Sequence, residues 1–239
     1  MLLLTIIFYS ALALWTILMG ILSIPFIVLP SKFIRFPAKA WIKGIFILLE
    51  YICGVTHEVR GLNDITKEPL IIVSKHQSAF ETFALYYYLE SSFFIHKKQL
   101  FYIPIFGQYL LKSNMVSIDR AGQAKAMRKM ISDVKKKLDE GSTIIIFPEG
   151  TRKKPGEKAD YKSGFVGIYN AAKRKIKPVA LNSGLFWKKG IKIIKKGHII
   201  IEFLPEIEIG LEKKEVLEQV ESSIAVSYTH LTLPTKRIV

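Results

Sequence analysis

The sequence predicts an α/β fold, with a mixed, mostly parallel sheet flanked by helices and an N-terminal membrane-embedded helical segment. From about residue 56 short apolar runs alternate with amphipathic stretches, and this alternation is typical of strands joined by helices. Residues 1–30 contain no charged side chain, and about 20 apolar residues are enough to cross a bilayer. We therefore expect membrane-anchoring helices over residues 1–55, one α/β domain over residues 56–226 and a separate tail over residues 227–239.

The N-terminal segment continues with basic residues among aromatic ones. Lys32, Arg35, Lys39 and Lys43 precede a second apolar run, IFILLEYICGV. This pattern is typical of a membrane hairpin, or of one span followed by an interfacial helix whose cations meet anionic headgroups. The positive-inside bias places these cations, and the chain after them, in the cytoplasm. A signal peptide is the alternative, but its basic n-region is missing and the apolar run is too long.

Composition favours a membrane partner. The chain has 35 Lys and Arg against 20 Asp and Glu, a net charge of +15, and yet half of its residues are apolar. An anionic membrane surface accounts for both properties, whereas a nucleic-acid binder usually has a well-solvated remainder and no stacking motif accompanies the charge here. The single cysteine, Cys53, can form no intramolecular disulfide, which indicates a reducing compartment and a buried structural thiol.

The α/β domain is predicted element by element from periodicity and turn residues. The most regular segment is the helix over 121–141, where apolar residues from Ala124 to Leu138 recur at steps of three and four and Gly141 ends the run. The other predicted helices are 81–90, 164–175 and 212–225, and residues 100–113 are expected to form a loop and a helix interrupted by Pro104 and Gly107. The predicted strands are 69–75, 92–98, 114–120, the strand and turn over 142–152, 176–184, and an edge strand over 197–209.

The last residues, SYTHLTLPTKRIV, differ from the rest of the domain. They lack helical periodicity and resemble translated adapter or vector sequence, so we interpret 227–239 as a non-native tail and exclude it from the fold. A genuine short tail is the alternative.

His76 and Glu81 are the first candidates for chemistry. A histidine can accept a proton from a hydroxyl group, and a carboxylate at its other ring nitrogen fixes the tautomer. Five residues along one helix turn the side chains about 140° apart, so the two meet only if His76 precedes the helix. Ser78 and Glu81 form the S-x-x-E pattern of a capping box with Ser78 as N-cap, which favours this geometry. A glutamate that only caps the helix explains the same pattern.

The second candidate is FPEGTR, which follows an apolar strand. Proline, glycine and threonine favour a tight turn with outward backbone N–H groups, and Arg152 offers a forked donor suited to phosphate. Glu149 could hold this turn by pairing with a lysine or arginine. Lys97 and Lys98 before an apolar loop, and Arg120 beside Asp119, are further cations for which simple solvation or pairing is the alternative.

Four stretches, HQSAFE, KKQLFYIPIFG, FPEGTR and IKPVALNSG, resemble in this order the sequence blocks of the PlsC-type glycerolipid acyltransferases, the 1-acylglycerol-3-phosphate O-acyltransferase family. The resemblance covers roughly residues 40–210 and implies the glycerolipid acyltransferase fold over the domain 56–226. It implies a catalytic dyad of His76 and Glu81, and phosphate contacts by Lys98 and Arg120. It also implies substrate-binding and turn roles for Phe147, Pro148, Glu149, Gly150, Thr151 and Arg152.

Two positions depart from the family's pattern. Glu81 stands where the family has aspartate, which adds one methylene to the reach toward the imidazole. Gln99 stands where the second block commonly has glutamate, so the ion pair expected there is absent.

The resemblance implies transfer of a fatty acyl group from a thioester, acyl-coenzyme A or acyl carrier protein, to the sn-2 hydroxyl of lysophosphatidic acid. The product would be phosphatidic acid for phospholipid biosynthesis, made at the inner membrane with the catalytic domain in the cytoplasm. No cofactor is expected beyond the thioester co-substrate. No covalent intermediate is expected either, because Cys53 lies in an apolar run and no G-x-S-x-G motif occurs.

Alternatives to this function remain at the level of sequence. The acceptor could be glycerol-3-phosphate, another lysophospholipid or a lyso-aminolipid. The chain could also be a non-catalytic membrane protein that binds anionic lipid through its basic face. A metal site is not expected, because the five histidines are dispersed and His76 and Glu81 lack the i, i+4 spacing that converges on one ion.

Overall fold

Seven strands form one mixed sheet in the order β1-β7-β6-β2-β5-β3-β4. The computed structural model describes residues 1–66, 68–103, 106–113, 115–119, 123–157, 160–190 and 194–232. All strand pairs are parallel except β6 with β7, which confirms the predicted mixed, mostly parallel sheet. The strands are β1 (Val55–Arg60), β2 (Ile71–Ser74), β3 (Ser92–Lys97), β4 (Val116–Ile118), β5 (Thr143–Ile146), β6 (Ile176–Leu181) and β7 (Gly197–Phe203).

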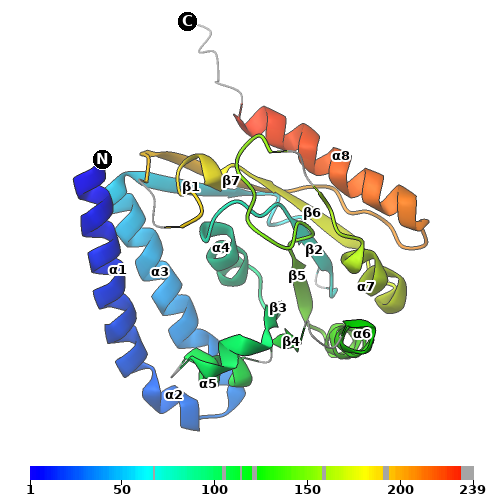
Figure 1. The fold of residues 1–239 in the computed structure, drawn as a ribbon, viewed down its shortest axis with the longest axis horizontal. Coiled ribbons are helices and arrows are strands. Elements are labelled where there is room, and N and C mark those ends of the chain that lie inside the picture. Colours follow the sequence, from blue (N-terminus) through cyan, green and yellow to red (C-terminus); the bar gives the residue numbers. More distant parts are fainter. Residues whose placement is uncertain are drawn as a thin grey trace, which may run out of the picture.

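Helices cover both faces of the sheet (Figure 1). The α-helices are α1 (Leu2–Leu22), α2 (Ile24–Val28), α3 (Arg35–Cys53), α4 (Phe80–Tyr88), α5 (Phe106–Lys112), α6 (Gln123–Asp139), α7 (Gly164–Ala172) and α8 (Lys213–Thr232). Short 3-10 helices add η1 (Ser31–Phe33), η2 (Lys98–Tyr102) and η4 (Ser183–Leu185).

The alternation of side chains along the central strands divides the core into two layers. On one face Ile72 and Ile145 pack with apolar residues of α3 and α4. On the other face Ile71 and Ile144 pack with residues of α6, α7 and α8. Buried on both faces, these strands read as continuous apolar runs in the sequence, as strands of parallel sheets do.

The N-terminal helices form a hairpin in which α1 and α3 lie side by side, joined by α2 (Figure 1). In the described part of the chain, α1 is the one helix long and apolar enough to cross a bilayer. The hairpin contacts the α/β domain near both of its ends. Near the start of α1 the Ile194 N–H donates to Thr5 Oγ1 at 3.1 Å, and near the turn Tyr109 Oη donates to the Ser23 carbonyl at 2.5 Å.

Arg35, which the sequence pattern assigned to lipid headgroups, points instead into the protein. Its guanidinium donates to the carbonyls of Tyr86, Leu89 and Ser92 at 2.8–3.0 Å and lies 4.1 Å from the centre of the Tyr86 ring. These carbonyls belong to the end of α4 and the residues after it, where a helix leaves acceptors without partners. The expectation that all four cations of this stretch face headgroups is therefore wrong for Arg35.

One strand was not predicted, and one strand prediction needs correction. The structure has a strand, β1, that the sequence reading did not include, although VTHEVR alternates buried or half-buried with exposed residues as a half-buried strand does. Residues 197–203, predicted as an edge strand, form β7 between β1 and β6. Pro205, near the end of this strand, suggested an edge position in the sheet. The actual position of the strand depends on its pairing with β1, which is far away in sequence.

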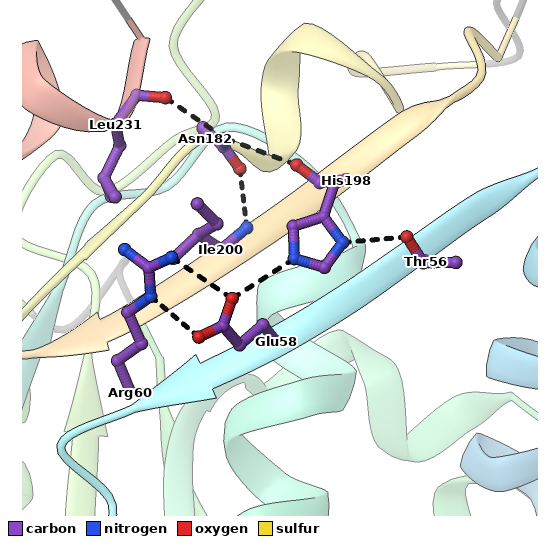
Figure 2. Close-up of polar contacts among 7 residues, drawn as sticks. All are labelled: Thr56, Glu58, Arg60, Asn182, His198, Ile200 and Leu231. Carbon is purple, nitrogen blue, oxygen red and sulfur yellow. Dashed lines mark hydrogen bonds and ion pairs between the residues drawn. The ribbon is translucent and has the colours of Figure 1, made fainter. Parts of the chain in front are cut away.

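The C-terminal helix extends beyond the predicted end of the domain. α8 continues to Thr232, so the expectation that the tail lacks helical structure is wrong for residues 227–232, while the origin of residues 227–239 stays a prediction. Figure 2 shows how this end is attached: Asn182 Nδ2 donates to the carbonyls of Leu231 at 3.4 Å and His198 at 3.5 Å, and its Oδ1 accepts the Ile200 N–H at 2.8 Å. One side chain therefore joins the end of β6 to β7 and α8.

Candidate active site

His76 and Glu81 meet as the capping pattern predicted. His76 lies in the turn between β2 and α4, and Glu81 lies in the first turn of α4. His76 Nδ1 is 3.0 Å from Glu81 Oε1. The histidine side chain is 15% exposed, whereas the Glu81 side chain is fully buried. The N-cap of α4 is Ala79, one residue after the predicted N-cap, Ser78, but Ser78 Oγ still accepts the Phe80 N–H at 3.1 Å.

The Glu81 carboxylate is fixed by four neighbours. Besides His76, the backbone N–H groups of Gln77 and Ser78 donate to Oε1, each at 2.6 Å, and Ser183 Oγ donates to Oε2 at 2.6 Å. A buried carboxylate requires such donors, because removal from water without them is costly. The Glu81 carboxylate therefore caps the start of α4 and orients His76 at the same time.

Ser183 reaches Glu81 from a segment far away in sequence, η4, which follows β6. The approach is close: a Cβ added to Gly184 would lie 2.7 Å from the Gln77 Cβ, a distance that side chains do not adopt. A glycine at 184 is thus needed for η4 to contact the turn that carries His76. Both Ser183 and Gln77 are buried.

The FPEGTR turn packs directly on the histidine. The Phe147 ring stacks on the His76 ring, with centroids 4.1 Å apart and planes at 16°. The turn is fixed by bonds from the Gly150 N–H to the Phe147 carbonyl and from the Lys162 N–H to the Pro148 carbonyl, both at 3.0 Å. Gly150 has φ of +65°, a conformation that glycine adopts without strain. β2 and β5 are adjacent and parallel, so the two motifs emerge at the same edge of the sheet.

Glu149 of this turn points away from solvent, behind the histidine. It is 1% exposed, and its Oε1 accepts the His76 N–H at 3.4 Å. Burial raises the pKa of Glu149 to about 7, against the opposing attraction of Lys75. Lys75 is also buried, and its ammonium lies 4.5 Å from the centre of the Tyr228 ring. Burial lowers the pKa of this lysine.

A cavity of about 1610 Å³ connects the dyad to the N-terminal hairpin. Its walls include α1, α3, α5 and α6, with Ile17, Trp41 and Met127 among the apolar side chains. His76 lines it, together with Phe147, Pro148, Gly150, Thr151 and Arg152. Small-molecule sites usually occupy roughly 300–1,000 Å³, so this cavity suits a larger, mostly apolar ligand.

Four cationic side chains line the cavity, and two of them, Lys162 and Lys189, lie beside the FPEGTR turn. The four are Lys97, Arg152, Lys162 and Lys189, and Asp119 is the one acidic side chain among the described lining residues. Lys189 Nζ lies 3.4 Å from Thr151 Oγ1, and the Lys162 ammonium lies beside Gly150. An anionic group bound there would lie beside the histidine.

The structure brings together most, but not all, of the residues that the sequence suggested. Lys98 is exposed, lies 3.9 Å from Asp119 and is absent from the described cavity lining, whereas the neighbouring Lys97 belongs to it. Arg120 lies outside the described residues. Cys53 is buried and free, as expected of a structural thiol. Among the residues that the structure describes, no three His, Cys, Asp or Glu side chains gather as metal ligands do.

Three polar residues of the site were missed in the sequence. Lys162 and Lys189 lie in no sequence motif, and Ser183 lies in the IKPVALNSG block but was assigned no role; they reach the site because β6 lies beside β2 and because the chain after FPEGTR returns to it. A signal was available for Ser183, which belongs to the IKPVALNSG block and follows a strand end, where site residues of parallel sheets gather.

A histidine oriented by a buried carboxylate and open to a large apolar cavity can remove a proton from a hydroxyl group. The adjoining cations add a site for an anionic headgroup. Fold and site together are compatible with a transferase that acts on the hydroxyl of an amphipathic acceptor.

Comparison with known proteins identifies the family. Residues 56–182 match the acyltransferase family. A 1-acyl-sn-glycerol-3-phosphate acyltransferase from Pseudomonas aeruginosa is 32% identical over 188 residues, which cover 77% of this chain and 73% of that protein. A protein of the same name from Helicobacter pylori is 38% identical over 168 residues, covering 67% and 70%. The chain therefore belongs to the PlsC-type 1-acyl-sn-glycerol-3-phosphate acyltransferase family, as the four blocks predicted.

A solved structure confirms the fold. The crystal structure of the 1-acyl-sn-glycerophosphate acyltransferase PlsC from Thermotoga maritima matches with a TM-score of 0.78 and 21% identity, covering 98% of this chain and 97% of that chain. The N-terminal helices therefore belong to the shared fold. A plant relative from Limnanthes douglasii is 28% identical, and the match covers 67% of this chain and 57% of that protein.

Proposed function

We propose that this acyltransferase transfers a fatty acyl group from a thioester to the sn-2 hydroxyl of lysophosphatidic acid, which gives phosphatidic acid. One observation carries the proposal: the His76 ring lines the cavity while its Nδ1 is bonded to the buried Glu81. Among the described residues the other nitrogen, Nε2, has no hydrogen-bond partner, so it is available to the substrate. The bacterial relatives are 1-acyl-sn-glycerol-3-phosphate acyltransferases by name, which supports this acceptor.

The reaction needs no covalent enzyme intermediate. His76 Nε2 accepts the proton of the acceptor hydroxyl as its oxygen attacks the thioester carbonyl. The tetrahedral intermediate then breaks its carbon–sulfur bond, and His76 returns the proton to the thiolate. Glu81 stabilises the imidazolium between these steps. General-base assistance of this kind contributes roughly 10²–10⁴-fold in rate.

The remaining residues position the two substrates. Arg152 binds the acceptor phosphate in a forked geometry, and Thr151 and Gly150 form the adjoining surface. The apolar walls from α1, α3 and α5 hold fatty acyl chains. The donor is a thioester of coenzyme A or of acyl carrier protein, and no other cofactor takes part.

The hairpin attaches the enzyme to one leaflet of the inner membrane, with the α/β domain on the cytoplasmic side. Most of α1 is exposed and apolar, with Leu14 70% and Leu18 48% exposed. Because α1 contacts the domain through Thr5 and the turn after it does so through Ser23, a hairpin standing across the bilayer would draw the polar domain into lipid. A hairpin lying in the interface keeps both contacts and delivers lipid to the cavity.

Thioester release by purified protein tests this function, with lysophosphatidic acid, glycerol-3-phosphate and other lysolipids as acceptors. We expect His76→Ala to lower kcat by about 10²–10⁴-fold. Glu81→Gln should lose far more activity than Glu81→Asp, since a neutral amide no longer stabilises the positive charge that forms on His76, whereas aspartate keeps the carboxylate. Ser183→Ala should lose less than Glu81→Gln, because it removes one of four partners of the carboxylate.

The protein offers a matched control for the dyad. His198 and Glu58 also form a His–Glu pair, at 3.4 Å, but on the exposed outer face of β1 and β7 (Figure 2). His198→Ala should keep full activity. Full thioester release by a folded His76→Ala variant would contradict the catalytic proposal, and the absence of a preference for lysophosphatidic acid would contradict the acceptor.

A further inference from the structure

The segment after β6 connects the catalytic dyad to the N-terminal helix. It begins at Ser183, whose hydroxyl donates to Glu81 at 2.6 Å, and continues to Lys189, which lines the cavity beside the dyad. Lys189 Nζ lies 3.4 Å from Thr151 Oγ1, in the same turn as Arg152. A cation of this segment therefore faces the turn that the proposed function assigns to the acceptor phosphate.

Helix α1 fixes this segment around Lys189. Tyr9 Oη accepts the Trp187 indole N–H at 3.0 Å and donates to the Gly190 carbonyl at 3.3 Å. The Phe8 ring packs edge-to-face on Trp187, with centroids 5.5 Å apart, and Trp187 is buried. One tyrosine hydroxyl of the N-terminal helix thus holds the residues on both sides of the Lys188–Lys189 pair.

The charges around Lys189 leave it available for an anion. Lys189, Arg152 and Lys162 line the cavity, and none of the three lies within 4.0 Å of a carboxylate in the part of the chain that the structure describes. A phosphate monoester carries about −1.5 to −2 charges at neutral pH, so several cations are needed to match it. A lysine ammonium is a point charge with three donors on a flexible stem, so it can reach such a ligand from the cavity wall.

We infer that Lys189 binds the phosphate of the acceptor opposite Arg152, and that Tyr9 of α1 sets its position. This inference rests on the proposed function and adds a specificity residue to it. The helix that meets the membrane also holds part of the headgroup site, so recognition of the acceptor depends on how α1 packs against the domain.

The test compares Lys189→Met with Lys188→Met, a control at the neighbouring exposed lysine, which is not among the cavity-lining residues. Each variant is assayed with lysophosphatidic acid and with a neutral 1-acylglycerol, and KM is measured for the acceptor and for acyl-coenzyme A. We expect Lys189→Met to raise KM for lysophosphatidic acid about tenfold, with kcat changed less than twofold and no change with the neutral acceptor. Lys189→Arg should restore most of the affinity, and Lys188→Met should change nothing.

Tyr9→Phe tests the role of α1, because it removes both hydrogen bonds and keeps the ring. We expect KM for lysophosphatidic acid to rise about threefold, while the melting temperature falls modestly, because the Trp187 indole N–H loses its acceptor but the protein stays folded at the assay temperature. Equal KM values for Lys189→Met and Lys188→Met would overturn the phosphate assignment, and a rise confined to acyl-coenzyme A would assign Lys189 to the donor instead. An unchanged KM in Tyr9→Phe would overturn the role of α1. All of these comparisons are made with unmodified protein that is active. A failure of the proposed function would appear as inactive unmodified protein, so the two failures can be distinguished.

Discussion

Glu149 shows how a motif residue can serve a site without facing its cavity. Its carboxyl group is buried behind His76, accepts the histidine's backbone N–H and has a pKa raised to about 7 by burial. An acid that titrates at about 7 in the folded protein holds its proton more tightly there than in the unfolded chain. The FPEGTR turn is therefore coupled to pH in the neutral range.

This coupling predicts the pH dependence of stability. Because the folded-state pKa lies above the usual value of 4.5, the contribution of Glu149 is most favourable below about pH 4.5 and is lost as pH rises to about 7. The loss is about 3 kcal/mol at most. We expect Glu149→Gln to remove this part of the slope when urea unfolding of the detergent-solubilised protein is followed from pH 5 to 8. Glu218→Gln, at an exposed glutamate of α8, should keep the slope, and an equal slope in Glu149→Gln would contradict the assignment.

At this scale the sequence predicted the dyad and the turn but not their supports. His76 and Glu81 are close in sequence, and the capping pattern restricts their geometry, so the contact could be predicted. Ser183 could not be, because its contact with Glu81 depends on the parallel pairing of β2 with β6. Glu149 was expected to hold its turn by an ion pair, and burial produced instead a bond to a backbone N–H.

At the scale of elements, Arg35 joins the hairpin to the sheet. It begins α3 and satisfies three carbonyls at the end of α4 and the start of β3. A basic residue among aromatic ones has two physical roles open to it, a headgroup contact or a helix C-cap, and sequence alone does not distinguish them. In the structure, the packing of α3 against α4 places Arg35 at the C-terminal end of α4, where it acts as the cap.

Removing this cap should destabilise the enzyme. We expect Arg35→Met to lower the free energy of unfolding by about 2–4 kcal/mol, because buried carbonyls lose their partners. Lys43→Met, at an exposed position of the same helix, should change it by less than about 0.5 kcal/mol. Thermal unfolding in the same detergent measures both. A smaller effect for Arg35 than for Lys43 would show that water replaces the guanidinium.

At the scale of the whole molecule, the hairpin gives the enzyme one apolar side. Its exposed large apolar residues include Leu3, Ile6, Leu14, Leu18, Val28 and Phe36. Contiguous apolar surface of this kind marks a membrane or protein contact. The composition predicted a membrane partner. The contacts at both ends of the hairpin favour an interfacial position of the hairpin over a transmembrane one.

Membrane binding can be tested on this surface directly. Leu14→Glu with Leu18→Glu should lower partition into vesicles of anionic phospholipid at least tenfold, since each buried leucine contributes roughly 1.5–3 kcal/mol. Val226→Glu, an exposed apolar position on α8, is the control and should bind as the unmodified protein does. Sedimentation with vesicles measures both. Equal vesicle binding by the Leu14 and Leu18 double variant and by Val226→Glu would show that the membrane-binding surface lies elsewhere on the protein.

The pairing of β1 has a consequence for the order of folding. The hairpin leads through Gly54 directly into β1, but β1 pairs only with β7, and the register joins Val55 to Gly197. Contacts so distant in sequence form late, because a long loop must close first. During synthesis the apolar hairpin is complete while β1 still lacks its partner. With the membrane attachment proposed above, the hairpin would meet the lipid surface before the sheet closes, and the proposed catalytic centre would form on a chain that is already attached.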